Sequence, residues 1–389
     1  MKTLIELYDE RPIENVLSTE MFRPETTVFL CPGETAQNRE LKKALKAYFK
    51  RRGCGNVQLV FLPVSTVSAE SVEKSLLTCA ENYEDCAVDI SGGTDAALFA
   101  AGRFSAGKQI PVFTYSRKSN TFYEISNAPF ARSLPCDIRL SAEDCFLMAG
   151  GAVREGRAEE GSLKRHLDLI EPLFILFDRY RRIWQRQILW FQQASRKEEG
   201  LEARAPETVH APNHTVTVNT SLLTDLADAG LIEQLSRGEE ITFRFASEMV
   251  RFWLRDVGSA LECWVYKNCL DSGLFDDVRL SEVVSWSGSG AGDSVTNEID
   301  VVCVRGTVPF LISCKACDVK TEALNELKIL KDRFGGYGSR AAVITSSTPG
   351  RNGSAMRRRA SELGIEVIEH RDLGWERLQG RMRALTAAR

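Results

Sequence analysis

Short apolar runs alternate with longer amphipathic stretches over the first 125 residues of the chain. We expect the apolar runs to form strands, at residues 3–8, 27–31, 57–64, 87–91 and 111–115. The amphipathic stretches predict helices, at residues 13–22, 36–51, 69–83 and 95–105. A hairpin over residues 114–125 is expected to follow the fifth strand. This alternation predicts a doubly wound, Rossmann-like α/β domain.

The pattern changes after Pro135. We expect one long helical stretch, rich in aromatic and basic residues, over residues 163–193, and then a polar linker or exposed loop over residues 196–212. Residues 221–255 predict short helices and include LADAGLI, a pattern common in winged-helix modules that connect domains. A third unit with helices and strands follows. The predicted domains are therefore residues 1–135, 136–245 and 246–389.

The segment NEIDVVCVRGTVPFLISCK, residues 297–315, is the most informative part of the third unit. Strand alternation places Glu298 and Asp300 on one face of a strand, and Ser313 and Lys315 on one face of the next strand. A turn between these strands would pair Asp300 with Ser313 and Glu298 with Lys315, with Cβ atoms about 4.5 to 5.5 Å apart. Two carboxylates and one ammonium group would then converge at one end of a hairpin.

A helical pattern over residues 250–265 precedes this hairpin, and Glu262 lies at the edge of its apolar face, where it could reach Asp300. Carboxylates beside a lysine suit phosphodiester hydrolysis, because the acids hold Mg²⁺ or Mn²⁺ and the lysine orients the attacking water. The candidate catalytic residues are Asp300, Lys315, Glu262, Glu298 and Ser313. The candidate metal ligands are Asp300, Glu262, Glu298 and Cys314. A surface ion pair on an ordinary hairpin is the alternative interpretation.

This combination of helix, hairpin and following helix resembles the PD-(D/E)XK nuclease superfamily, over roughly residues 248–370. The resemblance implies that Asp300 is the metal-binding acid, Lys315 the catalytic lysine and Glu262 the acid on the helix. Ser313 stands where the family pattern usually has an acid, and Glu298 would compensate for the missing charge. An inactive descendant of such a nuclease is the alternative.

The loop SGGTDA, residues 91–96, follows the fourth predicted strand and opens a helix. Paired glycines let the backbone approach a ligand, and amides at a helix N-terminus bind phosphate or a polar ring edge. Three other loops that follow strands are expected at the same edge of the sheet. The candidate ligand-binding residues are Ser91, Gly92, Gly93, Thr94, Asp9, Arg11, Gly33, Glu34, Thr35, Ser65 and Thr66. Thr94 is also a plausible helix N-cap.

The order of these parts resembles the CRISPR-associated Rossmann fold (CARF) nucleases, in which a sensor domain precedes a PD-(D/E)XK domain. The matching segments are the strand alternation, SGGTDAAL and the following hairpin, and then NEIDVV and ISCK. The resemblance implies a homodimer that binds a cyclic oligoadenylate, most often tetra-adenylate, as an allosteric activator. It also implies metal-dependent cleavage of DNA, RNA or both in type III CRISPR antiviral defence. We expect residues 163–255 to connect sensor and nuclease and to transmit the ligand-driven movement.

Two other functions stay open. The winged-helix-like segment would suit a non-catalytic, nucleotide-sensing transcriptional regulator. The sequence SGGTD is also similar to the SGGxD motif of ATP pyrophosphatases, although Ala96 replaces the serine that follows in that motif.

Charge and cysteine content narrow these possibilities. The 50 basic and 53 acidic side chains give a net charge of −3, which excludes a polybasic chain, so any contact with nucleic acid must be local. No apolar run approaches the roughly 18 to 20 residues that cross a bilayer, and MKTLIELYDE is not a signal peptide. The eleven cysteines are scattered along the chain, which favours a reducing cytoplasm over a disulfide framework.

Overall fold

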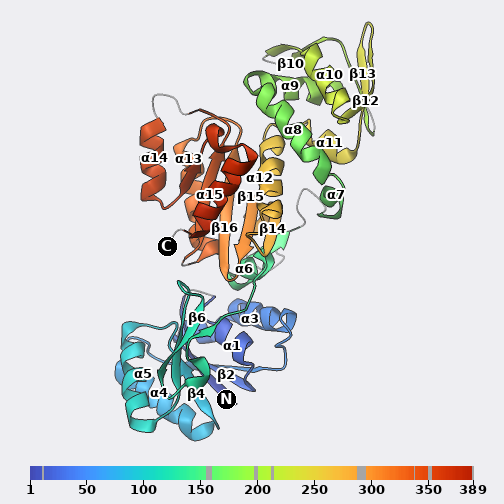
Figure 1. The fold of residues 1–389 in the computed structure, drawn as a ribbon. Helices are drawn as coiled ribbons and strands as arrows, with labels where there is room; N and C mark the ends of the chain where they lie inside the picture. Colours follow the sequence, from blue (N-terminus) through green and yellow to red (C-terminus); the bar gives the residue numbers. More distant parts are fainter. Residues whose placement is uncertain are drawn as a thin grey trace.

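The computed structural model describes residues 1–10, 13–154, 160–196, 200–211, 214–286, 295–336, 338–348 and 353–387. Three units follow one another in space (Figure 1). We call them the N-terminal unit (residues 1–135), the C-terminal unit (residues 142–154 and 259–387) and the winged-helix-like unit (residues 160–253). The C-terminal unit lies between the other two.

The N-terminal unit is built on a seven-stranded sheet with the order β3-β2-β1-β4-β5-β6-β7. Its strands are β1 (Thr3–Leu7), β2 (Thr26–Cys31), β3 (Gln58–Pro63), β4 (Cys86–Asp89), β5 (Val112–Ser116), β6 (Thr121–Ser126) and β7 (Leu134–Pro135). The strands β1 to β5 are parallel, whereas β6 and β7 are antiparallel. The predicted doubly wound fold and its closing hairpin are confirmed.

Helices cover both faces of this sheet, and they are α1 (Leu17–Phe22), α2 (Gly33–Gln37), α3 (Arg39–Arg51), α4 (Ala69–Asn82), α5 (Asp95–Lys108) and the short η1 (Pro129–Ala131). Apolar side chains of α4 and α5 pack on one face of the sheet, and those of α1 and α3 pack on the other. The single helix expected over residues 36–51 is instead α2 and α3. They are separated at Asn38, whose side chain caps α3 by accepting a hydrogen bond from the Leu41 N–H at 3.0 Å.

The winged-helix-like unit contains α7 (Glu160–Lys164), α8 (Leu167–Arg179), α9 (Arg181–Ala194), α10 (Thr220–Asp228) and α11 (Glu248–Trp253). Its strands are β9 (Glu202–Ala205), β10 (Thr208–Ala211), β11 (His214–Thr217), β12 (Ile232–Arg237) and β13 (Ile241–Phe245). The expected single helix over 163–193 breaks at Tyr180, whose hydroxyl donates to the Asp225 carboxylate at 2.7 Å. The expected linker over 196–212 contains β9, which pairs with β13, and β10, which pairs with β11.

The C-terminal unit is built on a six-stranded sheet with the order β18-β17-β16-β15-β14-β8. Its strands are β8 (Ala152–Arg154), β14 (Asp277–Ser285), β15 (Thr296–Arg305), β16 (Val308–Lys315), β17 (Arg340–Thr345) and β18 (Glu366–Ile368). Its helices are α6 (Ala142–Met148), α12 (Ser259–Asp271), α13 (Thr321–Leu330), η2 (Lys331–Gly335), α14 (Gly353–Glu362), η3 (His370–Asp372) and α15 (Trp375–Ala387). Apolar residues of α12 and α15 pack with one face of the sheet, and those of α13 pack with the other.

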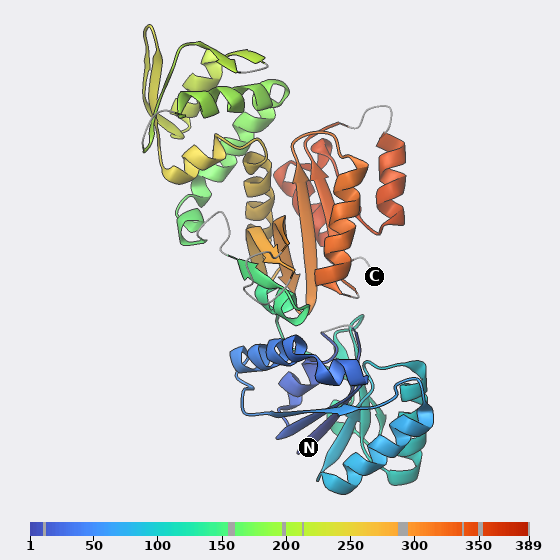
Figure 2. The same ribbon diagram turned by 180° about the vertical axis from the view of Figure 1, so that it is seen from behind.

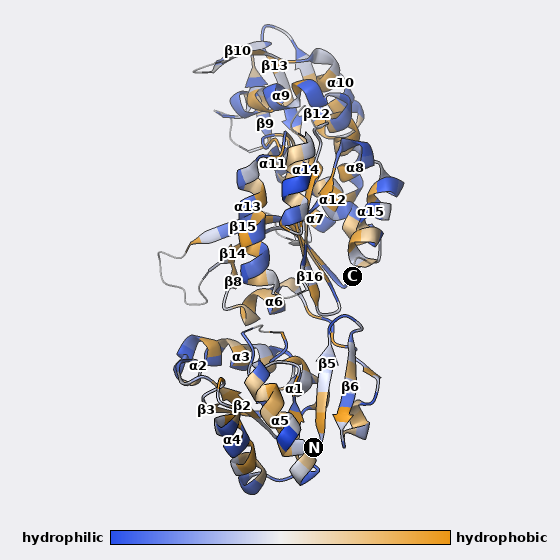
Figure 3. Cartoon of the chain, turned by 90° about the vertical axis from the view of Figure 1, so that its left-hand side faces the viewer, coloured by the Kyte–Doolittle hydropathy of each residue, from blue (hydrophilic) through white to orange (hydrophobic). Residues whose placement is uncertain are grey.

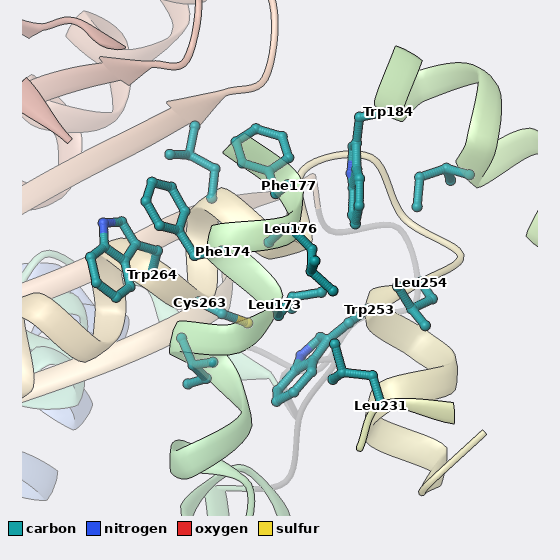
Figure 4. Close-up of a cluster of buried hydrophobic side chains, with 14 of the residues drawn as sticks. Leu173, Phe174, Leu176, Phe177, Trp184, Leu231, Trp253, Leu254, Cys263 and Trp264 are labelled. Carbon is teal, nitrogen blue, oxygen red and sulfur yellow. The ribbon is translucent and has the colours of Figure 1, made fainter. Parts of the chain in front are cut away.

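The winged-helix-like unit and the C-terminal unit share one hydrophobic core. Phe174 of α8 stacks on Trp264 of α12, with ring centroids 4.4 Å apart and ring planes within 2° of parallel. Figure 4 shows these rings in one cluster with Trp253 and Cys263. This continuous core joins the two units as one body, on the side of the C-terminal unit that faces away from the N-terminal unit.

The N-terminal unit contacts the C-terminal unit directly. The Tyr115 and Thr307 hydroxyls lie 3.0 Å apart, and in the segment that joins the two units the Leu140 N–H donates to the Gly306 carbonyl at 2.9 Å. The position expected for residues 163–255, between sensor and nuclease, is therefore wrong. That expectation assumed that order along the chain gives order in space, whereas α6 and β8 lead the chain into the C-terminal sheet before the winged-helix-like unit begins.

Figure 3 shows the hydropathy of each residue on the same fold. Hydrophilic residues colour much of α14, whose arginines Arg357 to Arg359 bind Glu362 and Glu369. The described helices include none that combines the length and apolar character needed to cross a membrane.

Candidate functional sites

The β15–β16 hairpin forms in the register that strand alternation predicts. Its ladder runs from the turn to Val301, which lies opposite Ile312, and the same register places Asp300 opposite Ser313. The backbone pairing ends there. Beyond it the Cys314 N–H donates a hydrogen bond to the Asp300 side chain, at Oδ2, over 2.6 Å. The carboxylate is thereby fixed at the point where the two strands separate.

The same oxygen of Asp300 has two further partners. The Ser313 hydroxyl donates to it at 3.2 Å, and the Lys315 ammonium group lies 3.3 Å from it. The Asp300 and Lys315 side chains are 16% and 34% exposed, so the pair is partly shielded from water. Burial, the largest single influence, lowers the pKa of Lys315, but the attraction and hydrogen bond of Asp300, together with Cys314 and Glu262, raise this pKa above its ordinary value. Lys315 is therefore positively charged at neutral pH.

Glu262 approaches this pair from the first turn of α12. Burial is the main cause that raises its pKa to about 8, and repulsion by Asp300, Asp256 and Glu298 adds to the shift. Attraction by Lys315 opposes the shift only in part. The helix and the hairpin therefore bring the predicted acids into one electrostatic environment, which holds more negative than positive charge.

A cavity of about 90 Å³ opens beside the hairpin. Glu298, Asp300, Ser313 and Lys315 line it, together with Glu326 from α13. Glu326 carries no distinguishing signal in the sequence, because an acid beside an apolar helix face has the same spacing as any surface residue. Its Oε1 accepts a hydrogen bond from the Asn297 side chain at 3.1 Å, which connects α13 to the start of β15.

These residues fit a hard divalent cation with an incomplete protein shell. Among the described residues, no three His, Cys, Asp or Glu side chains lie close enough together to surround an ion. Mg²⁺ is commonly held by only one or two carboxylates, with water and substrate phosphate completing the shell, and the excess of acids around Glu262 favours a cation. Cys314 joins the site through its backbone N–H, whereas burial raises the pKa of its thiol well above the ordinary value and keeps the sulfur neutral.

The predicted ligand loops meet at the other sheet. The carboxyl ends of the parallel strands β1 to β4 lie at one edge, and the strand order reverses between β1 and β4, which is where doubly wound folds bind ligands. Asp9 follows β1, the α2 residues Gly33, Glu34 and Thr35 follow β2, Ser65 and Thr66 follow β3, and Ser91 to Thr94 follow β4. Arg11 lies outside the described residues.

The two glycines of the SGGT loop allow it to pack against the end of β1. A Cβ atom on Gly92 would lie 2.6 Å from the Asp9 Cβ and 2.9 Å from the Leu7 carbonyl oxygen. Gly93 has a φ of +96°, which side chains rarely adopt, and a Cβ atom there would lie 2.9 Å from the Leu7 Cβ. The loop and Asp9 therefore form one surface at the switch point.

Hydrogen bonds hold this loop in place. The Ser91 N–H donates to the Asp89 carboxylate at 2.7 Å, and the Ser91 Oγ accepts from the Tyr115 N–H at 2.7 Å. Thr94 has its expected N-cap role, since its Oγ1 accepts from the Ala97 N–H at 3.3 Å. The same hydroxyl also donates to the Thr66 carbonyl, which brings the loop after β3 to the loop after β4.

Comparisons with known proteins match residues 247–386 to one family model and the whole chain to two solved structures. Residues 247–386 match the family model described as "Card1-like, endonuclease domain". The whole chain shares its fold with protein VC1899 from Vibrio cholerae, with a TM-score of 0.75, 18% identity and coverage of 99% and 98% of the two chains. It also matches Can2 from Sulfobacillus thermosulfidooxidans, solved in complex with cyclic tetra-adenylate, with a TM-score of 0.70, 16% identity and 99% of each chain covered. No curated protein matches the sequence.

The chain therefore combines a Rossmann-like domain with a nuclease domain, and the resemblance to the CARF nucleases is confirmed. Its residues 247–386 are similar to the Card1-like endonuclease domains. The individual site residues stay predictions, and so do the domain boundaries at residues 135 and 245.

Proposed function

We propose that this protein is a metal-dependent endonuclease of the PD-(D/E)XK type, switched on by a cyclic oligoadenylate, with tetra-adenylate as the first candidate, in type III CRISPR antiviral defence. The observation that carries the proposal is the Asp300 carboxylate, which receives the Cys314 N–H and faces the Lys315 ammonium group beside Glu262, within a Card1-like endonuclease domain. The eleven cysteines, all within the described residues, are free thiols, which suits the reducing cytoplasm where we place the protein.

Each residue of the nuclease site has a distinct part in this proposal. Asp300 and Glu262 would hold Mg²⁺ or Mn²⁺, with Glu298 adding negative charge at the rim of the cavity. When bound, such an ion supplies positive charge to the phosphate and lowers the pKa of water. Lys315 stays protonated beside Asp300, so it holds that carboxylate in position and stabilises charge on the phosphate. Ser313 supplies a hydrogen bond to Asp300 where the family usually has an acid.

The ligand loops suit a cyclic nucleotide. The edge at the switch point offers glycine backbone at Gly92 and Gly93, hydroxyl groups at Thr94 and Ser65, and the start of α5, where amide groups favour phosphate. A homodimer would present two copies of this edge to a ring with matching symmetry, so that the ring favours one arrangement of the two chains.

The alternative of a transcriptional regulator is less well supported. The helix α10, which follows the strand-rich segment of the winged-helix-like unit, has the sequence TSLLTDLAD and carries no Lys or Arg. Its Asp225 is bound by Arg179 at 2.7 Å. A helix that reads DNA contacts phosphates and base edges with cationic and amide groups, and an acidic helix repels them.

The proposal is tested by incubating the purified protein with supercoiled DNA, single-stranded DNA and RNA in the presence of Mn²⁺ or Mg²⁺. Cyclic oligoadenylates of several ring sizes are added in parallel, and linear oligoadenylates of equal length serve as matched controls. We expect rapid cutting only when a metal ion and one ring are both present, and a slow basal rate with the metal ion alone. Equal cutting without any ring would contradict activation, and no cutting in any mixture would contradict the nuclease assignment. Release of pyrophosphate from ATP would favour the pyrophosphatase.

A further inference from the structure

The N-terminal unit reaches the nuclease hairpin at its turn. The β5–β6 hairpin and the turn between β15 and β16 lie at the junction of the two units (Figure 2). There the Tyr115 and Thr307 hydroxyls are 3.0 Å apart, and the two residues are only 6% and 1% exposed. The Tyr115 hydroxyl also donates to the Asn120 side chain at 2.8 Å, so Thr307 is the donor between the two hydroxyls. This is a buried, oriented contact between the two units.

On its other side, Tyr115 is tied to the proposed ligand loop. Its backbone N–H donates to the Ser91 Oγ at 2.7 Å, and Ser91 in turn donates from its N–H and hydroxyl to the buried Asp89 carboxylate. One residue of β5 thus contacts the SGGT loop through its backbone and the nuclease hairpin through its side chain. A shift of this loop on ligand binding would therefore move Tyr115 as well.

Thr307 lies at the opposite end of the hairpin from the nuclease site. The turn that contains Thr307 begins after Arg305, which lies five residue steps along β15 from Asp300, or roughly 17 Å at 3.3 Å per residue. The strands β15 and β16 lie in the middle of the six-stranded sheet, hydrogen-bonded to neighbours on both sides. A displacement at the turn is therefore carried along stiff, paired strands to the point where Asp300 and Lys315 project.

A second contact at this junction is made by Arg117. Arg117, which directly follows β5, forms an ion pair with Glu14 at 2.9 Å, and both side chains are buried. Among the described residues, its Nε and Nη1 have no hydrogen-bond partner, and its side chain lies against Gly338 of the C-terminal unit. A buried unpaired donor costs free energy, so a small shift of the junction that pairs these nitrogens would be favourable.

We propose that Tyr115 and Thr307 are positioning residues that couple the occupied ligand loop to the nuclease site. This inference rests on the proposed function and adds the route of its regulation. The route runs from Ser91 through Tyr115 and Thr307 along the hairpin to Asp300, and it does not pass through the winged-helix-like unit.

The test compares variants that remove or keep one hydroxyl. Tyr115→Phe and Thr307→Val remove the contact, whereas Thr307→Ser keeps a hydroxyl at the turn. Tyr123→Phe is the matched control, because Tyr123 lies on β6 and its hydroxyl bonds only within the N-terminal unit, to Ser119 at 3.1 Å. For each protein, the cutting rate with saturating cyclic oligoadenylate and Mn²⁺ is divided by the rate without the ring, so that altered ligand affinity does not enter.

We expect Tyr115→Phe and Thr307→Val each to lower this activation ratio by about fivefold to tenfold, the effect of one coupled hydrogen bond. The double variant should lose no more than either single variant, because both remove the same contact. Thr307→Ser and Tyr123→Phe should keep the wild-type ratio. A general loss of stability would lower both rates together and leave the ratio unchanged.

The outcomes separate the two proposals. If the wild type is activated but Tyr115→Phe and Thr307→Val keep its ratio, the coupling route is wrong and the proposed function stands. The route is also wrong if Thr307→Ser loses as much as Thr307→Val, since the loss would then not follow the hydroxyl. If no ring activates the wild type, the proposed function fails, and the coupling fails with it.

Discussion

Two acids, the buried Asp89 in the N-terminal sheet and the partly buried Glu262 beside the C-terminal sheet, show how differently the two sites are built. Burial is the main cause that raises the pKa of both, to about 6 for Asp89 and about 8 for Glu262. Their neighbours differ. Asp89 accepts hydrogen bonds from Ser18 and Ser91, which lower its pKa again, whereas Glu262 is near further acids, which raise its pKa more.

The difference separates a structural acid from a candidate ligand-holding acid. Hydrogen bonds from hydroxyl and amide groups stabilise the charge of Asp89, so this carboxylate holds the SGGT loop without needing a partner from solution. The charge of Glu262 is destabilised by Asp300, and the single ammonium of Lys315 does not balance it. The charge of Asp89 is therefore stabilised by its own neighbours, whereas we expect the charge of Glu262 to be stabilised by a bound cation.

Variants of Asp300 and Lys315, at the site where we expect a cation, test this difference with the largest expected effect. We expect Asp300→Asn and Lys315→Ala to lower the ring-activated cutting rate roughly 100- to 10,000-fold, the range for loss of a group that acts directly on the reacting atoms. The measurement is the initial rate of cutting with saturating ring and Mn²⁺. Binding of the ring should be unchanged, because neither residue lies in the N-terminal unit.

Asp271→Asn serves as the matched control for these two variants. Asp271 is in α12, the helix of Glu262, but it forms a surface ion pair with Lys267 at 2.7 Å. Its loss should leave the cutting rate within about twofold, because an exposed pair contributes little. Full activity in Asp300→Asn or Lys315→Ala would remove these residues from the site, and the excess of acids around Glu262 would then have no catalytic meaning.

What the sequence could predict here depended on strong local signals. The register that pairs Asp300 with Ser313 followed from alternation and a short turn, and both are local. Glu326 and the contact between Tyr115 and Thr307 depend on packing between distant segments, which alternation does not record. The strand β9 was missed because its buried residues are Ala203 and Ala205, whose small side chains give a weak apolar signal in an otherwise polar stretch.

The helix break at Tyr180 had the same kind of cause. The helices α8 and α9 both carry apolar residues at helical spacing and together read as one periodic stretch, but they pack on different partners. Phe174 of α8 stacks on Trp264 of the C-terminal unit, whereas Trp190 of α9 packs near Phe243 of its own unit. Only the tertiary structure requires a change of direction between them.

The proposed ligand site of the N-terminal unit is tested by adding a side-chain atom to the SGGT loop. Gly92→Ala would place a Cβ atom 2.6 Å from the Asp9 Cβ and 2.9 Å from a backbone oxygen, so the loop must shift. We expect about 1 to 3 kcal/mol lower free energy of unfolding and at least about tenfold weaker ring binding. Urea unfolding and calorimetric titration with cyclic tetra-adenylate measure these quantities.

Gly102→Ala is the control for this change. Gly102 lies within α5, the helix that the SGGT loop opens, and a Cβ atom there would have nothing within 4 Å. Alanine is the better helix former, so this variant should be slightly more stable, by up to about 1 kcal/mol, with unchanged ring binding. If both variants bind the ring as the wild type does, the loop at the switch point is not the ligand site.

The smallest expected effect is on the pH dependence of the free energy of unfolding, to which Glu262 and Asp89 contribute over different pH ranges. In metal-free protein, the folded chain holds the Glu262 proton up to about pH 8, whereas an unfolded glutamate releases it near 4.5. The stability from this group is therefore full below about pH 4.5 and is lost as the pH rises through about 8, by at most about 1.4 kcal/mol per pH unit. For Asp89 the corresponding window runs from about 3.8 to about 6.

Unfolding by urea in the presence of a chelator separates these windows. Between pH 6 and 8, the stability of the wild type should fall relative to Glu262→Gln but stay constant relative to Asp89→Asn. Because a cation favours the charged form of Glu262, Mn²⁺ should remove the first difference and leave the second unchanged. Two outcomes would contradict this interpretation. One is a fall in wild-type stability relative to Asp89→Asn between pH 6 and 8, and the other is a fall relative to Glu262→Gln that persists with Mn²⁺.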